Sequence, residues 1–450
     1  AGLPAARVPN ARSALAPIAA AFYRHPGRQL RVVGITGTKG KTTTSTLASG
    51  ILDSGDHRSG LITTVDFKIG ARWWPNGTRQ TTPEALEVQS LLRDMADAGC
   101  DYAVVESSSH ALSPGWNRLG GCEYDLAVLT NITHEHLDYH GSFAQYRADK
   151  AELFRMLATS AREKIVRGEL VRPPKLAIVN LDDPNAQFFL DSAPGVQAMT
   201  YAVAQASADV RAVDIVDSRT GLAFTAVTPQ GQRRLELALA GSFNVPNVLA
   251  ALCIGLSQGI ALEQCAQALE QAPPVRGRMA LIDAGQPFTV IVDYAHNPDS
   301  FEKLFAVMRP LTKGKLIALF GSAGERDLEK RPSQGAIAAR FCDLLVLADE
   351  DPRGEDRNAI IAQIALGAQA AGMREGSGYL RIADRAQAIR AALAQAAPGD
   401  IVLLLGKGHE GSIIYADHKL PWDEAAEARA ALAELGWRSV TRGQGDTGTR

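Results

Sequence analysis

Little in the sequence points to a membrane, an extracellular compartment or a nucleic acid. The chain has only five cysteines among 450 residues, and no two of them form a C-x-x-C pair, so we expect neither a disulfide framework nor a secreted protein. No apolar run approaches the roughly 18 residues that cross a bilayer, and the alanine-rich start shows no clear signal-peptide pattern. The net charge of −2 gives no reason to expect nucleic acid or an anionic membrane as a partner. These absences predict a cytoplasmic protein.

What the sequence does contain is a regular alternation of strands and helices. Its length predicts two or three domains, because a single hydrophobic core rarely exceeds about 250–300 residues. The alternation in the first half predicts a parallel sheet with helices on both faces. We predict strands at 31–36, 59–64, 101–106, 124–130 and 175–180, helices at 41–54, 83–98, 142–158, 244–258 and 261–270, a loop at 159–172, and an antiparallel patch near 209–240.

A proline-containing break at 271–277 separates this α/β region from a second one. Strands near 279–283, 288–293, 315–320, 342–348 and 400–405 again alternate with helices, which predicts a doubly wound, Rossmann-like domain. The predicted organisation is a lead-in at 1–29 (with a helix at 12–22 interrupted by Pro17), a central domain at 30–274, a C-terminal domain at 275–440 and a disordered tail at 441–450.

A glycine-rich turn in the central domain has the composition of a phosphate-binding loop. Residues 32–44 read VVGITGTKGKTTT, a buried strand followed by Gly37, Gly40, Lys41 and Thr42. Backbone N–H groups in such a turn, together with a helix N-terminus, attract phosphate oxygens. Lys41 would reach the β- and γ-phosphates of ATP, and the Thr42 hydroxyl would ligate Mg²⁺. The first glycine is displaced from its place in G-x-x-x-x-G-K-T, and a glycine-rich turn without a ligand would explain Gly37 and Gly40 alone.

Two more polar clusters follow strands of the same domain. Glu106 opens the segment ESSSH, and a carboxylate at this place is a second Mg²⁺ anchor in P-loop enzymes, although it would also cap a loop. Residues 130–141, TNITHEHLDYHG, hold three histidines and two carboxylates. They favour a metal site, and a binuclear metallohydrolase is one alternative, but Tyr139 interrupts its H-x-H-x-D-H string. Surface histidines without a role are the other alternative.

In the second domain, four charged or glycine-rich loops each follow a predicted strand. They are VDYAHNP at 292–298, FGSAGERD at 320–327, DEDPR at 349–353 and GKGHEG at 406–411. Each alone is ordinary loop chemistry, but all four at one sheet edge predict a substrate site.

Together these motifs resemble those of the Mur ligase family, ATP-dependent enzymes that form amide bonds in peptidoglycan precursors. GITGTKGKTTT, ESSSH, TNITHEHLDYHG, YRADK, GSFNVPN, GRM, DYAHNPD, FGSAGERD, DPRGED and GKGHE occur in the family's order. HLDYHG, DYAHNPDS and GKGHE are most similar to the tripeptide synthetase branch, which adds a diamino acid to UDP-N-acetylmuramoyl-L-alanyl-D-glutamate. The resemblance covers residues 8–435 and implies a P-loop central domain, a Rossmann-like C-terminal domain, and a part in cell wall biogenesis, cell shape and cell division.

The resemblance also implies roles for individual residues. Catalysis would rest on Lys41, Glu106, His136 and Lys150. Two Mg²⁺ ions would be held by Thr42, Glu106, His136 and Lys150, the last as N6-carboxylysine. ATP would contact Gly37, Thr38, Gly40, Lys41, Thr42, Thr43, Asn244, Asn247, Arg278, Asp293, Tyr294 and His296. The residues from Asn244 onward would equally suit a helix start and a domain hinge. The acyl acceptor would contact Thr81, Thr82, Ser109 and Arg118, and the incoming amino acid Arg326, Asp351, Arg353, Gly406 and Glu410.

Three departures from the family pattern stand out. Relatives carry a uridine-nucleotide-binding domain before the phosphate loop, of which only the tail is expected here, through truncation. The loop at 113–117 before Arg118 looks longer than in some relatives. Diaminopimelate-adding relatives carry Asp-Asn-Pro-Arg, whose arginine pairs with the distal carboxylate, whereas this chain has Asp351 in place of the asparagine. The added carboxylate favours a bare ammonium, as on lysine or ornithine, while Arg353 and Glu410 favour diaminopimelate.

Three functions therefore stay open. The first is a Mur-type ligase acting on small molecules as a monomer. The second is a folylpolyglutamate or cyanophycin-type ligase of the same superfamily, which would suit the missing uridine domain. The third is a nucleotide-binding module without ligase activity.

Overall fold

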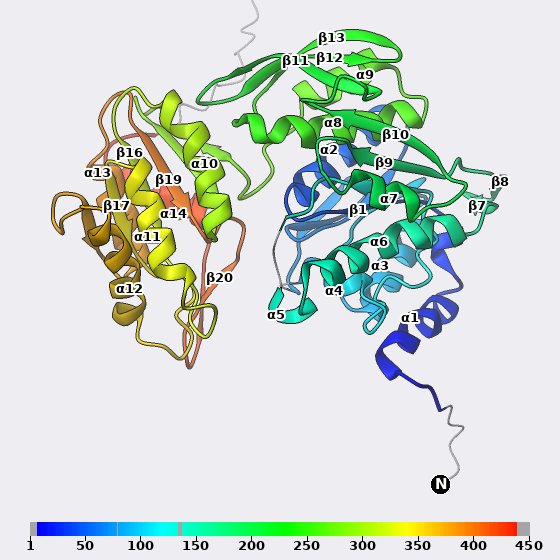
Figure 1. Ribbon diagram of the computed structural model, residues 1–450, viewed down its shortest axis with the longest axis horizontal. Helices are drawn as coiled ribbons and strands as arrows, with labels where there is room; N and C mark the ends of the chain where they lie inside the picture. Colours follow the sequence, from blue (N-terminus) through cyan, green and yellow to red (C-terminus); the bar gives the residue numbers. More distant parts are fainter. Residues whose placement is uncertain (1–6, 79, 134–136, 439–450) are drawn as a thin grey trace, which may run out of the picture. The chain divides into compact units, whose positions relative to one another are not determined.

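The computed structural model of the chain describes residues 7–78, 80–133 and 137–438 and divides into two compact units (Figure 1). The first unit comprises the chain up to Val216 with Ala223–Leu237 and Phe243–Pro273. The second comprises Pro274 onward with Asp217–Leu222 and Ala238–Ser242. Each unit is a sheet covered by helices, so the predicted α/β fold class is confirmed. The tail predicted at 441–450 lies outside the described residues.

In the described residues, the first unit is built on an 11-stranded sheet with the order β13-β12-β11-β10-β9-β6-β1-β5-β2-β3-β4. Pairing is parallel from β11 to β2 and antiparallel at β2–β3 and β3–β4. Because β1 lies between β5 and β6, the polar segments that follow these three strands meet at one edge of the sheet. The strands are β1 (Arg31–Thr36), β2 (Ser59–Ile62), β3 (Asp66–Ile69), β4 (Arg72–Pro75), β5 (Tyr102–Glu106), β6 (Leu126–Leu129), β9 (Leu176–Asn180), β10 (Gln197–Ala202), β11 (Val210–Asp217), β12 (Leu222–Thr228) and β13 (Gly231–Leu237).

Helices cover both faces of this sheet. They are α1 (Ala11–Phe22), α2 (Lys41–Ser54), α3 (Ala85–Asp97), α4 (Ser109–Leu112), α5 (Leu137–His140), α6 (Phe143–Thr159), α7 (Ala186–Asp191), α8 (Val245–Ser257) and α9 (Leu262–Glu270), with short turns η1 (Pro26–Arg28) and η2 (Ser242–Asn244). Helices α2, α8 and α9 pack together on one face, while α3, α6 and α7 lie on the other (Figure 1). Alternate residues such as Val32 and Val105 join Leu92 and Leu153 in one core. Gly34 lets α6 approach β1, since a Cβ there would lie 2.4 Å from Leu153 Cδ1.

Two predictions about local structure in this unit were wrong. The segment predicted as a loop at 159–172 contains a hairpin, β7 (Lys164–Val166) and β8 (Glu169–Val171). Arg167 and Gly168 form its tight turn with φ of 52° and 85°, and the basic composition hid a buried Lys164 that pairs with Asp125. Helix α1 is continuous with Pro17 inside it, and it packs against α3. The short strands β3, β4 and β10 were not predicted.

The second unit is the predicted doubly wound domain. Its sheet has the order β14-β15-β19-β16-β17-β18, parallel except for β14. The strands are β14 (Ala280–Ile282), β15 (Thr289–Asp293), β16 (Leu316–Phe320), β17 (Leu344–Leu347), β18 (Tyr379–Arg381) and β19 (Ile401–Leu405), and a separate hairpin consists of β20 (Ser412–Ile414) and β21 (Lys419–Pro421). Helices α10 (Pro298–Leu311), α11 (Lys330–Phe341) and α12 (Arg357–Ala370) share one core, and α13 (Arg385–Ala394) and α14 (Glu424–Glu434) the other.

Alternation along the strands builds these two cores. Leu403 and Leu405 pack with α10, α11 and α12, whereas Val402 and Leu404 pack with α13 and α14. Side chains of Asn297, Asp356, Asp384 and Asp423 accept hydrogen bonds from the first backbone N–H groups of their helices, which fixes where each helix starts.

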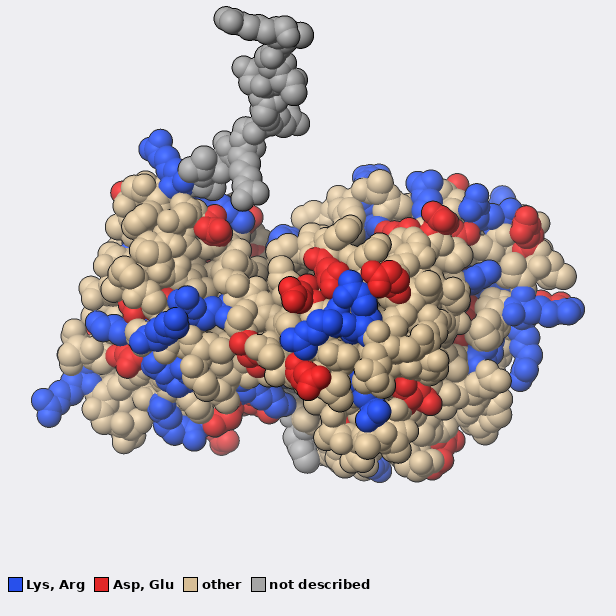
Figure 2. All heavy atoms as spheres, turned by 90° about the horizontal axis from the view of Figure 1, so that it is seen from above, with Lys and Arg blue, Asp and Glu red and all other residues tan. Residues whose placement is uncertain are grey.

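The surface gives no large single-signed area in the view of Figure 2. Lys and Arg side chains there alternate with Asp and Glu, in keeping with a net charge of −2. Within the described ranges, none of the helices combines the length and the apolarity needed to cross a membrane.

Candidate functional site

The glycine-rich turn lies between β1 and α2, and its two glycines are required by the space around them. Gly37 has φ of 147° and Gly40 has φ of 84°, a region that side chains with a Cβ rarely adopt. A Cβ on Gly37 would lie 1.9 Å from Thr130 Oγ1, and a Cβ on Gly40 would lie 2.0 Å from Asn247 Oδ1. The backbone therefore passes close to two neighbouring segments at these points.

Hydrogen bonds to the segment that follows β6 fix the conformation of the turn. Thr38 N donates to Asn131 O at 2.7 Å, and Lys39 N donates to Asn131 Oδ1 at 3.1 Å. Asn131 Nδ2 in turn donates to Lys39 O at 3.0 Å, and Thr130 Oγ1 donates to the same oxygen at 2.7 Å. Side chains therefore fix the loop, which is what preorganised anion sites need.

Two lysine ammonium groups converge on this turn. Lys41 Nζ donates to Gly37 O at 3.0 Å and to Thr38 O at 3.1 Å. Lys150 Nζ, from α6, donates to the same Gly37 oxygen at 2.7 Å and lies 4.6 Å from the Tyr146 ring centroid. Lys150 is 2% exposed, so it is not a solvated side chain on the outer face of α6, and its catalytic role stays a prediction. The pair concentrates positive charge where a polyphosphate would be bound.

Glu106 ends β5 beside the first turn of α2. Thr42 Oγ1 donates to Glu106 Oε2 at 2.9 Å, while Thr64 donates its N–H to Oε2 at 2.8 Å and its hydroxyl to Oε1 at 2.9 Å. A carboxylate and a hydroxyl side by side are oxygen donors of the kind that Mg²⁺ prefers. Among the described residues, no group of three or more His, Cys, Asp or Glu side chains is arranged to hold a metal ion. A Mg²⁺ here would therefore depend on Thr42, Glu106 and oxygens of its ligand.

The histidine-rich segment is only partly described. His136, predicted as a metal ligand, lies outside the described residues. His140 is buried, with Nδ1 2.6 Å from Asp149 Oδ2 and Nε2 3.0 Å from Ser109 Oγ. These contacts tie α5 to α4 and α6, so His140 and Ser109 have a clear structural role.

The two asparagines predicted to contact ATP lie at the start of α8, within reach of the turn. Asn247 Nδ2 donates to Asn244 Oδ1 at 3.0 Å, and Thr44 Oγ1 contacts Asn247 O at 3.4 Å. Thr43, next to Thr42 in α2, is 5% exposed. The structure thus brings together Gly40 and Asn247, which are distant in sequence.

The predicted acceptor residues gather around the segment that follows Glu106. Thr82 Oγ1 donates to Glu106 O at 2.7 Å and accepts from Ser108 N at 3.0 Å. Arg118 donates to Gln80 Oε1 at 2.7 Å and to Thr82 O at 3.2 Å, and it pairs with Glu84 at 2.7 Å. Thr81 is half-buried.

Burial lowers the pKa of Arg118 from its usual value, and Glu84 partly opposes this shift. The residues Thr64, Gln80 and Glu84 were not predicted. The contact of Thr64 follows from the position of β2 next to β5, which the sequence does not display, whereas Gln80 and Glu84 lie in the segment just before α3.

In the second unit, the predicted nucleotide residues surround Tyr294. Arg278 Cζ lies 4.8 Å from its ring centroid, and the rings of His296 and His409 lie at 4.7 and 4.8 Å. The Tyr294 hydroxyl donates to Glu410 Oε1 at 3.4 Å. Burial lowers the pKa of His409 to about 2, with nearby cations adding to the shift. A neutral imidazole is thereby packed among cations.

The Asp293 carboxylate accepts hydrogen bonds from the backbone where β15 ends. Its Oδ2 accepts from Met279 N at 2.8 Å, and its Oδ1 accepts from Ala295 N at 2.7 Å. Met279 has φ of 49°, so this contact holds a strained turn next to Arg278.

Most of the predicted amino-acid residues follow β17 or β19, and Arg326 follows β16. Lys407 Nζ donates to Asp351 Oδ1 at 2.8 Å and to Glu410 Oε2 at 2.6 Å, and Ile414 N donates to Asp351 Oδ1 at 2.9 Å. The Asp351 charge is therefore already balanced by Lys407, which the sequence analysis did not single out although it is part of GKGHE. This balance weakens the argument that Asp351 is a spare counter-charge for a substrate ammonium.

Two buried polar atoms at this edge of the second unit have no hydrogen-bond partner among the described residues. They are Glu350 Oε2 and Arg353 Nε. Burial raises the pKa of Glu350. Gly406 has φ of 97°, and a Cβ on it would lie 2.9 Å from Glu350 Oε2. Arg326 is exposed. Buried donors and acceptors without partners are available to a polar ligand.

Known protein families match both units of the chain. Residues 35–255 match the Mur ligase middle domain, and residues 277–408 match the Mur ligase glutamate ligase domain. A protein of Roseiflexus sp. (strain RS-1), described as UDP-N-acetylmuramyl-tripeptide synthetase, is 62% identical over 436 residues, covering 97% of this chain and 85% of the relative. A UDP-N-acetylmuramoyl-L-alanyl-D-glutamate–2,6-diaminopimelate ligase of Geobacillus kaustophilus (strain HTA426) is 41% identical, covering 96% of this chain and 85% of the relative.

A solved structure of a UDP-N-acetylmuramoyl-L-alanyl-D-glutamate–2,6-diaminopimelate ligase is also similar. It has a TM-score of 0.64 and 33% sequence identity, and the match covers 90% of this chain and 79% of that chain. The similarity thus extends over both units, in sequence and in fold.

Proposed function

Because the chain belongs to the Mur ligase family, we propose that it adds a diamino acid to UDP-N-acetylmuramoyl-L-alanyl-D-glutamate, with conversion of ATP to ADP and phosphate. The observation that carries the proposal is the phosphate loop with Thr42 hydrogen-bonded to Glu106 and with Lys41 and Lys150 on Gly37 O. The product would serve peptidoglycan synthesis, and through it cell shape and division. A ligase that uses ATP and a nucleotide-linked acceptor would work in the cytoplasm, and we propose that it does so as a monomer.

The proposed reaction has two steps. The side-chain carboxylate of the acceptor's D-glutamate attacks the γ-phosphorus of ATP, which releases ADP and leaves an acyl phosphate. The amine of the incoming amino acid then attacks the acyl carbon, loses a proton and expels phosphate. Both steps bring anions together, so the cationic loop, with Lys41 turned toward the β- and γ-phosphates, would lower the barrier by electrostatics and positioning.

Thr42 and Glu106 would hold one Mg²⁺, and His136 and Lys150 would serve a second. When bound, such ions supply charge neutralisation and orientation of the phosphates. We further propose that Gly37, Thr38, Gly40, Thr43, Asn244 and Asn247 contact ATP, with Arg278, Asp293, Tyr294 and His296 contributing from the second unit.

Lys150 is proposed to act as N6-carboxylysine. Its neutral amine would add to CO₂ and lose a proton, which converts a buried cation into an anionic oxygen ligand. The position of Lys150 supports this, because its Nζ is buried 2.7 Å from Gly37 O of the phosphate loop, where an anionic oxygen ligand would face the metal ion. Lys150→Ala is expected to abolish turnover, and ¹³CO₂ is expected to give a carbamate signal in the wild type only; unchanged turnover of Lys150→Ala would reject the role.

Amino-acid binding is proposed for Arg326, Asp351, Arg353, Gly406 and Glu410. The partnerless Arg353 Nε and Glu350 Oε2 support a zwitterionic ligand at this edge. Asp351 favours lysine or ornithine over diaminopimelate, although Lys407 balances much of its charge. Asp351→Asn is therefore expected to shift preference toward diaminopimelate in a competition of the three amines, and an unchanged ranking would leave Asp351 without a part in selectivity.

One assay tests the function as a whole. ADP release is measured with the muramoyl dipeptide nucleotide and a panel of lysine, ornithine and diaminopimelate, omitting each substrate in turn. Release that requires both acceptor and amine supports the ligase. Release with a folyl or peptide acceptor instead would support the folylpolyglutamate or cyanophycin-type alternative, and ATP binding without release would support a binding module.

A further inference from the structure

The loop that precedes Arg118 carries a tryptophan that the proposed reaction does not use. Arg118 Cζ lies 4.3 Å from the centroid of the Trp116 ring, and Arg12 Cζ of α1 lies 4.0 Å from it. A guanidinium over an indole is held there by the ring's electron-rich face. Trp116 therefore links α1 to an arginine of the proposed acceptor site.

The Nε of Arg118 is available to a ligand. The side chain is 8% exposed, and its terminal nitrogens bond Gln80, Thr82 and Glu84. Its Nε is buried without a partner in the described part of the chain. A buried N–H without an acceptor is costly, so an oxygen of the acceptor at this place would be well bound, provided that the guanidinium keeps its orientation.

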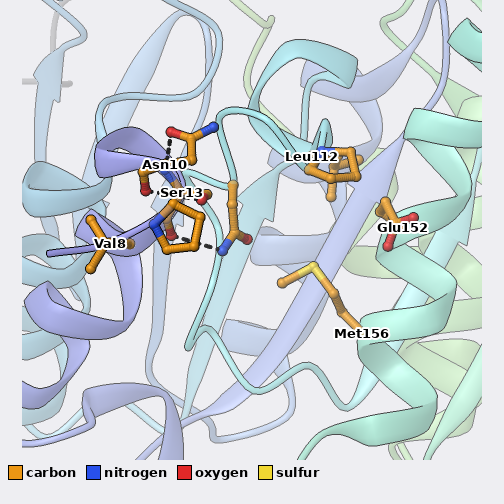
Figure 3. A pocket seen from close by; sticks show the side chains of 10 residues that line it. Val8, Asn10, Ser13, Leu112, Glu152 and Met156 are labelled. Carbon is orange, nitrogen blue, oxygen red and sulfur yellow. Dashed lines mark hydrogen bonds between the residues drawn. The ribbon is translucent and has the colours of Figure 1, made fainter.

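The loop is fastened to α1 as well as within itself, where Trp116 N and Asn117 N donate to Ser113 O at 3.0 and 2.8 Å. Asn10 Nδ2 donates to Gly115 O at 3.0 Å, and Asn117 Nδ2 donates to Ser13 O at 3.2 Å. A cavity of about 500 Å³ lies beside these contacts and is lined in part by Asn10, Ser13 and Asn117 (Figure 3). With open space beside the loop, these hydrogen bonds, the two arginine–tryptophan stacks and the Tyr139 ring at 6.4 Å hold Trp116 in place.

We propose that Trp116 is a positioning residue of the acceptor site, whose indole, held against α1 by Arg12, fixes the Arg118 guanidinium for an oxygen of the acyl acceptor. This inference rests on the proposed function. It assigns to α1 and to the longer loop a part in acceptor binding, and it separates Trp116 from residues that contact ATP or the incoming amine.

The test is the steady-state kinetics of Trp116→Leu. The KM for the muramoyl dipeptide nucleotide is expected to rise about five- to tenfold, with kcat at saturating acceptor and the KM for ATP within about twofold of wild type, as expected for lost binding alone. Trp116→Phe, which keeps an aromatic face, is expected to recover most of the loss. Arg12→Gln, which leaves the loop sequence intact, is expected to raise the same KM about two- to threefold.

Trp73→Leu is the matched control. Trp73 is 46% exposed and also carries a cation, Lys68 Nζ at 5.4 Å from its ring, but it has no contact with Arg118. Its KM for the acceptor is expected to stay at the wild-type value. An equal rise in Trp73→Leu would mean that loss of any exposed indole weakens the enzyme, and would reject the proposal.

A double-mutant cycle shows whether Trp116 acts through Arg118. In an Arg118→Lys background, Trp116→Leu is expected to add less than about twofold to the acceptor KM. The planar guanidinium that stacks on the indole is already absent from that background. A full five- to tenfold effect in that background would show that Trp116 contacts the acceptor itself, and an unchanged KM in Trp116→Leu alone would show that it has no part. Failure of the wild type to turn over would instead reject the proposed function, and this inference with it.

Discussion

The two units present their polar groups in different ways. In the first, the candidate site is a backbone shape: Gly37 and Gly40 have positive φ, and Asn131 bonds the turn from both sides. In the second, it includes a charge network in which Lys407 joins Asp351 to Glu410, and the buried pair of Arg385 with Glu424 lies beside it, since Arg385 also donates to Asp349 O and Leu405 O. A backbone shape tolerates no added atom, whereas a charge network tolerates changes of shape but no unpaired charge. The two sites should therefore fail under different substitutions.

The largest effect is expected from adding one methyl group to the phosphate loop. Gly37→Ala places a Cβ against Thr130 Oγ1 at a φ of 147°, so the turn must move. Turnover is expected to fall about a thousandfold, roughly 4 kcal/mol. Gly50→Ala in α2 is the control, because nothing lies within 4 Å of its added Cβ; it is expected to keep full activity and to stabilise by about 0.5–1 kcal/mol. Equal activities of the two variants would mean that the loop shape is not decisive.

The next effect concerns charge in the second unit. Arg385 and Glu424 are fully buried and share three hydrogen bonds, and Trp422 Nε1 also donates to Glu424. Glu424→Gln keeps the shape but leaves the Arg385 charge unpaired, and is expected to lower the free energy of unfolding of this unit by about 3–4 kcal/mol.

Urea unfolding followed by fluorescence measures this loss. The exposed pair of Arg390 with Glu434 offers the comparison, since Glu434→Gln should cost less than about 1 kcal/mol. A similar small loss in both variants would show that the second unit does not depend on buried charge.

A third substitution, in the first unit, removes a charge but keeps the shape of the side chain. Glu106→Gln keeps an oxygen for Thr42 and Thr64 but removes the negative charge beside the loop. Turnover is expected to fall about a hundredfold, or roughly 2.7 kcal/mol, with weaker dependence on Mg²⁺ concentration. The affinity for ATP is measured by titration with and without Mg²⁺. An identical Mg²⁺ dependence in Glu106→Gln and the wild type would show that Glu106 does not bind the metal ion.

The same contrast explains what the sequence could predict. The turn around Gly37 and Gly40 is local, since positive φ demands glycine within a few residues, and so the phosphate loop was recognisable. The contact of Thr64 with Glu106 spans 42 residues and depends on β2 lying beside β5, which no local pattern encodes. In the same way the segment that holds Lys164 was predicted as a loop, because the partner Asp125 is 39 residues away.

The smallest effect tests the charge network by protonation. The folded state holds the pKa of His409 at about 2 against 6.5 for the free group, so the unfolded chain binds more protons between these values. Stability should therefore rise with pH through this window and fall as the pH drops below 6.5. From pH 7 to pH 5 this group should cost the second unit about 2 kcal/mol. His409→Gln should remove that part of the slope in unfolding measured at both pH values, because glutamine does not titrate. An equal slope in the variant would mean that His409 takes up its proton in the folded state, and that the cations around it, Arg278 among them, do not oppose a further charge.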